Sequence, residues 1–297
     1  NISRGMDIPY FDFCGENIGF ISPCGVVAPE YFDDKGLGFL KSFTAGFMTT
    51  CGLKVAGAPC EYEGTSYGLH GNLSHTPAEN VSYVIDESGA TPCAVIRGTV
   101  RDAIIFGDKM SLNREIRCYY KDRKITVRDK VKNEGFKKVR QMILYHCNIG
   151  YPILTPDSEV YIPAMETKAR NEHAQEGIAD WMHPEVADPD YEEMCYYHKL
   201  KPDENNHSKV AIFNPELDLG IAIEIDLSTL DHLVQWKMMG AGDYVMGLEP
   251  ANSTIDGIED AVNNGSMKYL EPGEVKEYNL TFQILKGREE FEAVKNL

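Results

Sequence analysis

Long apolar runs are missing from this sequence: no stretch approaches the ~20 consecutive apolar residues that a membrane-spanning helix needs. Basic residues are also scarce, since 29 Lys and Arg stand against 46 Asp and Glu and give a formal net charge of −17. A field of that sign repels nucleic acid backbones and anionic lipid head groups. We therefore expect neither a nucleic acid nor a membrane surface as a partner, whereas a neutral ligand would feel little of this field.

No two of the eight cysteines form a C-x-x-C pair. The even count would allow four disulfides, but a chain of 297 residues can build a core without such links. We expect reduced thiols, most of them buried. The chain starts at Asn1 without Met, so a removed leader is neither indicated nor excluded. We expect a cytoplasmic protein.

Helical periodicity is nearly absent, because only residues 286–297 repeat apolar side chains at three-residue spacing. Alternating β-branched and aromatic residues dominate instead, in runs bounded by Gly, Pro, Asn and Asp. These runs predict strands at residues 95–100, 115–120, 124–131, 141–147, 210–214, 220–227 and 278–285. Many strands with little helix predict an all-β fold, a large antiparallel β-sandwich. No internal repeat or linker divides the chain, so we expect a single domain over residues 1–297.

Two longer stretches, residues 14–40 and 165–208, have no settled period. Long loops on a rigid β scaffold commonly carry function. The second stretch is acidic and holds four of the eight histidines. Its simpler interpretation, which we favour, is a solvated excursion over the surface.

Three short segments concentrate the residues that could carry chemistry. In the first, His70 lies in the string Gly68-Leu69-His70-Gly71, and glycines let a backbone turn sharply near a ligand. In the second, His146 and Asn148 are two residues apart and so face the same side of an extended chain. Taken alone, the first segment is more simply a turn with an exposed histidine, and the second a histidine satisfied in the core.

The third segment is Val245–Asn252, where Glu249 lies in an apolar strand just before Pro250. A buried carboxylate is costly unless it is paired. A buried ion pair or an edge position would explain it, whereas a raised carboxyl pKa in a cleft would suit a general base.

Together and in this order, the three segments resemble the galactose mutarotase-like superfamily, and residues 270–274 resemble its closing Leu-x-Pro-Gly-Glu turn. The sequence is most similar to an uncharacterised, aldose-1-epimerase-like branch. The strings that carry this likeness are Arg4–Ile8, Thr49–Leu53, Gly68–Gly71, Gln235–Gly240, Gly242–Tyr244 and Leu248–Pro250. The resemblance spans roughly residues 4–285 and implies the superfamily's β-sandwich and an isomerase that interconverts sugar anomers.

The resemblance also implies residue roles. Glu249 resembles the base that takes the proton of the anomeric hydroxyl, His146 the acid that protonates the ring oxygen, and His70 the second histidine near that oxygen. We expect this acid and base to lie far enough apart to straddle a pyranose.

Four residues are candidates for recognising sugar hydroxyls, because planar amides and charged groups can bind two hydroxyls at once. They are Arg4, Asp7, Gln235 and Lys237. The alternative for all four is sheet surface or structural ion pairs. Trp236 points away from its two neighbours on the strand, so we interpret it as core and not as a stacking platform for a sugar.

The sequence departs from typical mutarotases in two places. It has no clear counterpart of their hydroxyl-binding aspartate, with Asp231-His232 the nearest string, and it has His70-Gly71-Asn72 where they have His-Gly-Gly. We therefore expect a monosaccharide or modified sugar as the partner, without assuming glucose or galactose.

We expect no cofactor and no metal, because the spacing of His75 and Glu79 fits no strong ligand motif and Pro77 interrupts any helix there. Two other functions stay open. The same acid and base could enolise or eliminate beside a carbonyl in an oxidised sugar, or the domain could bind sugar without turnover.

Overall fold

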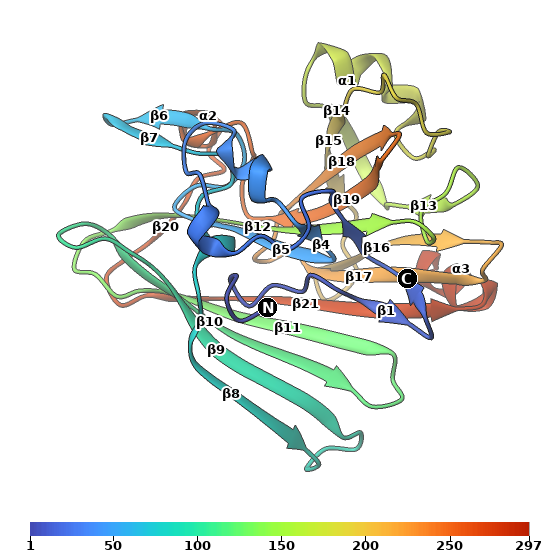
Figure 1. Cartoon of the computed structure of the whole chain (residues 1–297), viewed down its shortest axis with the longest axis horizontal. Helices are drawn as coiled ribbons and strands as arrows, with labels where there is room; N and C mark the ends of the chain where they lie inside the picture. Colours follow the sequence, from blue (N-terminus) through green and yellow to red (C-terminus); the bar gives the residue numbers. More distant parts are fainter. Residues whose placement is uncertain (297) are drawn as a thin grey trace.

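The computed structural model describes residues 1–296, and its strands form two large antiparallel sheets packed face to face (Figure 1). One sheet has eight strands in the order β13-β16-β17-β21-β11-β10-β9-β8. The other has the order β14-β15-β18-β19-β12-β20, with β5 paired to β12. The predicted all-β fold, a large antiparallel sandwich, is confirmed.

The strands are β1 (Asp12–Phe13), β2 (Glu16–Asn17), β3 (Phe20–Ile21), β4 (Ala45–Gly46), β5 (Met48–Leu53), β6 (Cys60–Tyr62), β7 (Thr65–Tyr67), β8 (Glu79–Asp86), β9 (Cys93–Ala103), β10 (Lys109–Tyr119), β11 (Lys124–Asn133), β12 (Val139–Gly150), β13 (Glu159–Tyr161), β14 (Ala164–Ala169), β15 (Met194–Leu200), β16 (His207–Asn214), β17 (Leu219–Asp226), β18 (His232–Gly240), β19 (Asp243–Ala251), β20 (Lys268–Leu270) and β21 (Val275–Lys286). The α-helices are α1 (Glu172–Glu176), α2 (Ile258–Asn263) and α3 (Arg288–Lys295). Short 3₁₀ helices are η1 (Pro29–Tyr31), η2 (Gly38–Ser42), η3 (Leu73–His75) and η4 (Ile178–Asp180).

Each predicted run falls on a strand of the large sheets, and the C-terminal helix forms as α3. Leu297, the last residue of the predicted helix, lies outside the described residues. The interpretation of residues 165–208 as an irregular excursion is partly wrong, because β14, β15 and the start of β16 lie within that stretch as sheet strands. The single-domain assignment stays a prediction.

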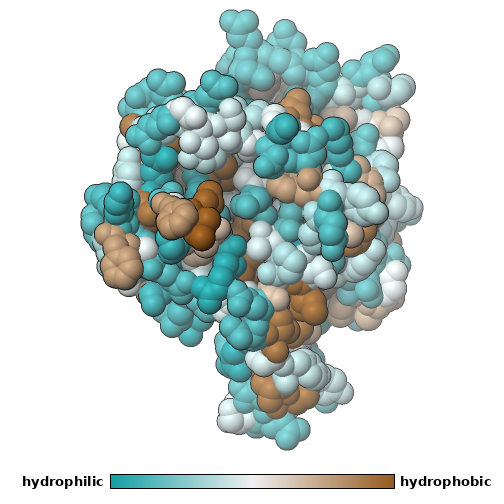
Figure 2. All heavy atoms as spheres, turned by 60° about the vertical axis from the view of Figure 1, so that its left-hand side comes forward, coloured by the Kyte–Doolittle hydropathy of each residue, from teal (hydrophilic) through white to brown (hydrophobic). Residues whose placement is uncertain are grey.

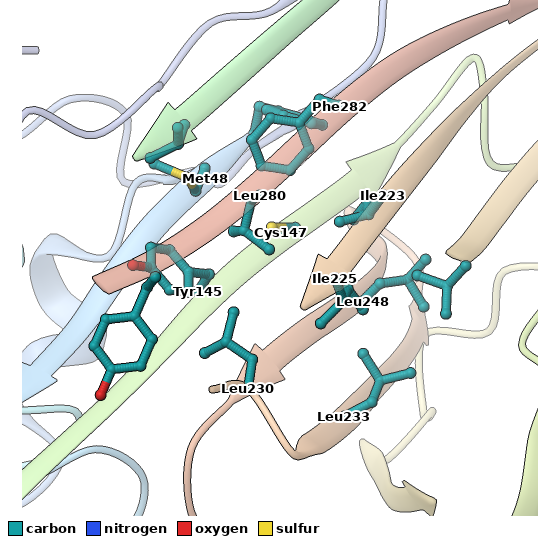
Figure 3. Packing of buried hydrophobic residues seen from close by; sticks show 14 of the residues in the cluster. Met48, Tyr145, Cys147, Ile223, Ile225, Leu230, Leu233, Leu248, Leu280 and Phe282 are labelled. Atoms are coloured by element: carbon teal, nitrogen blue, oxygen red, sulfur yellow. The ribbon is translucent and has the colours of Figure 1, made fainter. Parts of the chain in front are cut away.

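The main core fills the space between the two sheets. On β12, Tyr145 and Cys147 point into this space and meet Leu280 and Phe282 of β21 (Figure 3). Because successive side chains of a strand point to opposite faces, the even-numbered residues of β12 lie on the outer face of their sheet. This alternation directs His146 and Asn148 away from the main core.

The end of the eight-stranded sheet extends past the body of the molecule. Its edge strand β8 exposes Val81, Tyr83 and Ile85, and Figure 2 shows apolar surface on this projecting part. Unpaired strand edges of this kind are open to further pairing. This edge is formed by different strands from those that hold the candidate site.

All eight cysteines are free thiols, as expected, but only four of them are buried. The buried ones are Cys51, Cys93, Cys147 and Cys195. Within residues 1–296, no helix is long and apolar enough to cross a membrane.

Candidate functional site

His146 and Glu249 come together because their strands are neighbours. Strands β12 and β19 are antiparallel neighbours, with Cys147 of β12 paired to Leu248 of β19. The same register places His146, one residue before Cys147, opposite Glu249, one residue after Leu248. Cross-strand neighbours place their Cβ atoms about 4.5–5.5 Å apart on one face of the sheet. The Nε2 atom of His146 lies 3.2 Å from Oε1 of Glu249.

The pair lines a cavity of about 660 Å³ on the outer face of this sheet. That volume falls in the range of about 300–1,000 Å³ typical of small-molecule sites. Aromatic rings surround the pair: Phe43 and Trp236 lie with their ring centroids 5.0 and 5.3 Å from that of His146. The segment between β3 and β4 contributes much of the apolar wall, including Phe39, Leu40 and Phe43.

His70 joins the site from a turn between β7 and η3. Its backbone φ is +60°, in the left-handed region, and Gly71 follows with a φ of +71°. The ring centroid of His70 lies 5.5 Å from that of His146, and both line the cavity. The backbone N–H of Gly57 donates to Nδ1 of His70 at 3.2 Å. The structure thus brings together the three residues that the motifs singled out.

Burial pushes the two members of the pair toward their neutral forms. The pKa of the Glu249 carboxyl is raised well above its usual value by desolvation and by the nearby Glu193 carboxylate, while Arg170 opposes this shift. Desolvation lowers the pKa of His146 to about 4, against the hydrogen bond between its Nδ1 and Oδ1 of Asn148, which raises it. Desolvation also holds the pKa of His70 well below its ordinary value.

The expected separation of acid and base is wrong. A pyranose cannot lie between two atoms 3.2 Å apart, so the pair does not straddle a sugar ring. The carboxylate and the imidazole instead face the cavity together. Oε1 of Glu249 has no well-aligned hydrogen bond to any described residue, although it lies close to His146.

Trp236, Arg170 and Glu193 also line the cavity, and none of them was predicted to do so. Trp236 was interpreted as core, but its ring lines the cavity and its Nε1–H donates to Glu193 at 2.7 Å. Arg170 lines the same wall, with its Nε held by Asp256 at 2.7 Å. Arg170 and Glu193 come from the acidic stretch that we had assigned to solvated surface, and no local sequence signal distinguishes them from its other charged residues.

Arg4 is not placed to bind a sugar in this cavity. Its guanidinium donates to the backbone carbonyls of Val27 and Ser42 and to Nε2 of His75. These contacts anchor the segment that forms the apolar wall. Arg4 therefore stabilises the wall of the cavity from outside and does not line the cavity itself.

Asp7 lies between the two sheets, also away from the cavity. Its Oδ1 accepts hydrogen bonds from Arg114 at 2.9 Å and from Thr50 at 2.7 Å. Arg114 is fully buried and also pairs with both carboxylate oxygens of Asp129. The hydroxyl-binding role predicted for Asp7 gives way to a structural ion network.

Gln235 and Lys237 point to the opposite face of β18 from Trp236, as strand alternation requires. Gln235 donates to the carbonyl of Trp181, and Lys237 donates to the carbonyl of Asp180 and pairs with Glu185 at 2.8 Å. Neither lines the cavity. Their predicted role in binding sugar hydroxyls does not fit these positions.

Metal ligation has no structural support within residues 1–296, where no three His, Cys, Asp or Glu side chains are grouped to hold an ion. His75 is buried, stacks on Phe32 with ring centroids 4.0 Å apart, and bonds to Arg4 and Ser42.

The fold is shared by several solved structures. A putative aldose 1-epimerase from Klebsiella pneumoniae is 27% identical with a TM-score of 0.94, covering 99% of this chain and 78% of that chain. A galactose mutarotase-like protein from Clostridium acetobutylicum is 13% identical with a TM-score of 0.61, covering 84% of this chain and 82% of that chain. An aldose epimerase homologue from C. elegans is 10% identical with a TM-score of 0.58, covering 95% of this chain and 92% of that chain.

The architecture is thus that of a galactose mutarotase-like protein, as the motifs implied. The family described as "Domain of unknown function (DUF4432)" matches residues 1–284, and the chain belongs to that family. No curated protein matches the sequence.

Proposed function

We propose that this protein is an aldose 1-epimerase-like isomerase that interconverts the anomers of a monosaccharide or modified sugar. The observation that carries the proposal is the contact of 3.2 Å between His146 and Glu249 inside a cavity large enough for a sugar. Titratable groups with environmentally shifted pKa values in a cleft are typical of acid/base sites.

The close contact fits the chemistry better than a wide separation would. The two oxygens that exchange protons in mutarotation, the anomeric hydroxyl and the ring oxygen, are bonded to the same carbon. An acid and a base that serve them must therefore be neighbours. A sugar entering from the cavity would present both oxygens to the pair from one side.

In the proposed reaction, the Glu249 carboxylate takes the proton of the anomeric hydroxyl while the His146 imidazolium protonates the ring oxygen. The bond between the anomeric carbon and the ring oxygen breaks, and an aldehyde forms. After rotation about C1–C2, the ring oxygen attacks the other face of the aldehyde, returns its proton to His146, and the new anomeric oxygen takes one from Glu249. Glu249 and His146 therefore both recover their starting protonation states after one turnover.

Burial favours the neutral forms of both residues, so the starting ion pair forms when Glu249 passes its proton to His146 across their contact of 3.2 Å, and burial then favours the stage that follows. The open-chain stage leaves a neutral carboxyl and a neutral imidazole, which are the forms that the dry environment of Glu249 and His146 favours. His70 would donate a hydrogen bond to the ring oxygen. Trp236 would pack against the apolar face of the sugar, and Arg170 and Glu193 would bind hydroxyls in place of the missing aspartate.

The test is NMR exchange or polarimetry on a panel of freshly dissolved sugars. Wild type should accelerate mutarotation of at least one sugar, and Glu249→Gln and His146→Ala should each lose about 10²–10⁴-fold, the usual contribution of positioned proton transfer. A panel without any acceleration by wild type would refute the proposal. Entry of solvent deuterium into a carbon–hydrogen bond would point to enolisation instead, because mutarotation exchanges only O–H protons.

A further inference from the structure

Asn148 makes three contacts that fix its side chain beside His146. Its Nδ2 donates to the carbonyl of Gly46 at 3.1 Å and to the carbonyl of His146 at 3.0 Å. Its Oδ1 lies 2.5 Å from Nδ1 of the His146 ring. Asn148 is fully buried, so no water competes for these groups.

These contacts determine which way the amide points. If the amide were reversed, its oxygen would face two carbonyl oxygens, which only accept hydrogen bonds. The oxygen must therefore face the ring. An amide oxygen is an acceptor, so Nδ1 of His146 must carry a hydrogen.

We propose that Asn148 is a positioning residue that holds neutral His146 in the Nδ1–H tautomer, leaving Nε2 free to exchange a single proton with Glu249. This inference rests on the proposed function for its catalytic meaning. The tautomer itself follows from the hydrogen bonds around Asn148.

His70 is held in the opposite way. The N–H of Gly57 donates to its Nδ1, so that neutral His70 carries its hydrogen on Nε2. The Nε2–H of neutral His70 is thus a fixed hydrogen-bond donor. Nε2 of neutral His146 carries no hydrogen and faces the carboxyl group of Glu249. Only His146 is arranged to pass a proton back and forth.

The first experiment is ¹⁵N NMR of the histidine rings in the full chain at neutral pH, without substrate. Because each ring nitrogen reports whether it carries hydrogen, His146 should show a protonated Nδ1 and a bare Nε2, and His70 the reverse. A protonated Nε2 on neutral His146 would overturn the proposal. This measurement needs no turnover, so it stands even if no sugar proves to be a substrate.

The second experiment compares Asn148→Ala with Asn252→Ala. Asn252 is an equally buried amide that also hydrogen-bonds to the β12 backbone, where its Oδ1 accepts from the N–H of Ile143, but it makes no hydrogen bond to His146. Asn148→Ala should mix the two His146 tautomers and lower kcat toward that of His146→Ala, whereas Asn252→Ala should lower stability and keep the wild-type tautomer. Equal His146 spectra in all three proteins would overturn the proposal.

A third variant, Asn148→Asp, places a negative charge beside Nδ1. An opposite charge favours the imidazolium, so the acidic limb of the kcat/KM profile and the NMR titration of His146 should both move to higher pH. If the side chain of residue 148 did not face Nδ1 of His146, neither the limb nor the titration would move. If this variant does not fold, the wild-type spectrum still decides the proposal.

Discussion

A β-carbon on Gly247 would lie 2.5 Å from Oε1 of Glu249, so the carboxylate folds back over a residue of its own strand that has no side chain. The position is further enclosed by the Cβ of Trp236 at 3.1 Å. Glycine at 247 is therefore required by the carboxylate and not by the backbone conformation of β19.

Gly247→Ala should displace the Glu249 carboxylate and lower kcat by about 10²-fold, since misplacement by ~1 Å can cost that much. The measurement is the mutarotation rate of the folded variant. Gly89→Ala is the control, because a Cβ there meets nothing closer than 3.8 Å. Full activity in Gly247→Ala would show that the carboxylate is not needed where the structure places it.

Trp236 should report ligand binding by fluorescence. The chain has two tryptophans, and only Trp236 lines the cavity. A bound sugar should change the emission of wild type and of Trp181→Phe, and the change should vanish in Trp236→Phe. A change that persists in Trp236→Phe would place the ligand elsewhere.

Strand positions could be predicted from local sequence, whereas His70, His146 and Glu249 were singled out by the family resemblance of three strings taken together. Alternation marks a strand, and His70, His146 and Glu249 lie in distinctive strings. What alternation cannot tell is which face of a strand meets the core. On β18, Trp236 was assigned to the core because its polar neighbours were assumed to face a ligand.

In the structure, Trp236 faces the cavity and its two polar neighbours face away from it. Residues distant in the sequence provide the hydrogen-bond partners of these neighbours. Gln235 and Lys237 are fully buried, yet the carbonyls of Trp181 and Asp180 accept their hydrogen bonds. These partners lie more than 50 residues away along the chain. Nothing in the local pattern around residue 236 predicts them, and the same holds for the contacts of Asp7 with Arg114.

Glu249→Gln should stabilise the protein increasingly as pH rises. Burial raises the pKa of Glu249 above its unfolded value of about 4.5, so between these two values the folded state binds more protons than the unfolded state. The stability from this group is complete below the unfolded pKa and is lost as pH rises through the folded pKa. Glutamine does not titrate and avoids that loss.

The check is urea denaturation of wild type and Glu249→Gln at several pH values from about 4.5 upward. The difference in unfolding free energy should grow with pH in favour of glutamine. A surface carboxylate, Glu277, provides the opposite case, because a hydrogen bond from Lys130 lowers its pKa. Its contribution is present above the unfolded pKa and lost as pH falls, so Glu277→Gln should never show the growing advantage. A pH-independent difference for Glu249→Gln would contradict the burial argument.

Comparing Asp7→Ala with Arg170→Ala should show that Asp7 stabilises the fold and that Arg170 contributes to sugar binding. Removing Asp7 takes a partner from the fully buried Arg114, and breaking a buried pair costs about 3–5 kcal/mol of unfolding free energy. The folded fraction should keep the wild-type KM, because Asp7 does not line the cavity.

Arg170→Ala should do the reverse. Arg170 is a quarter exposed at the cavity wall, so its loss should cost less stability and raise the KM for the sugar. Denaturation and saturation kinetics on both variants check this contrast. A raised KM in Asp7→Ala at full folding, with an unchanged KM in Arg170→Ala, would return the recognition role to Asp7 and place the sugar outside this cavity.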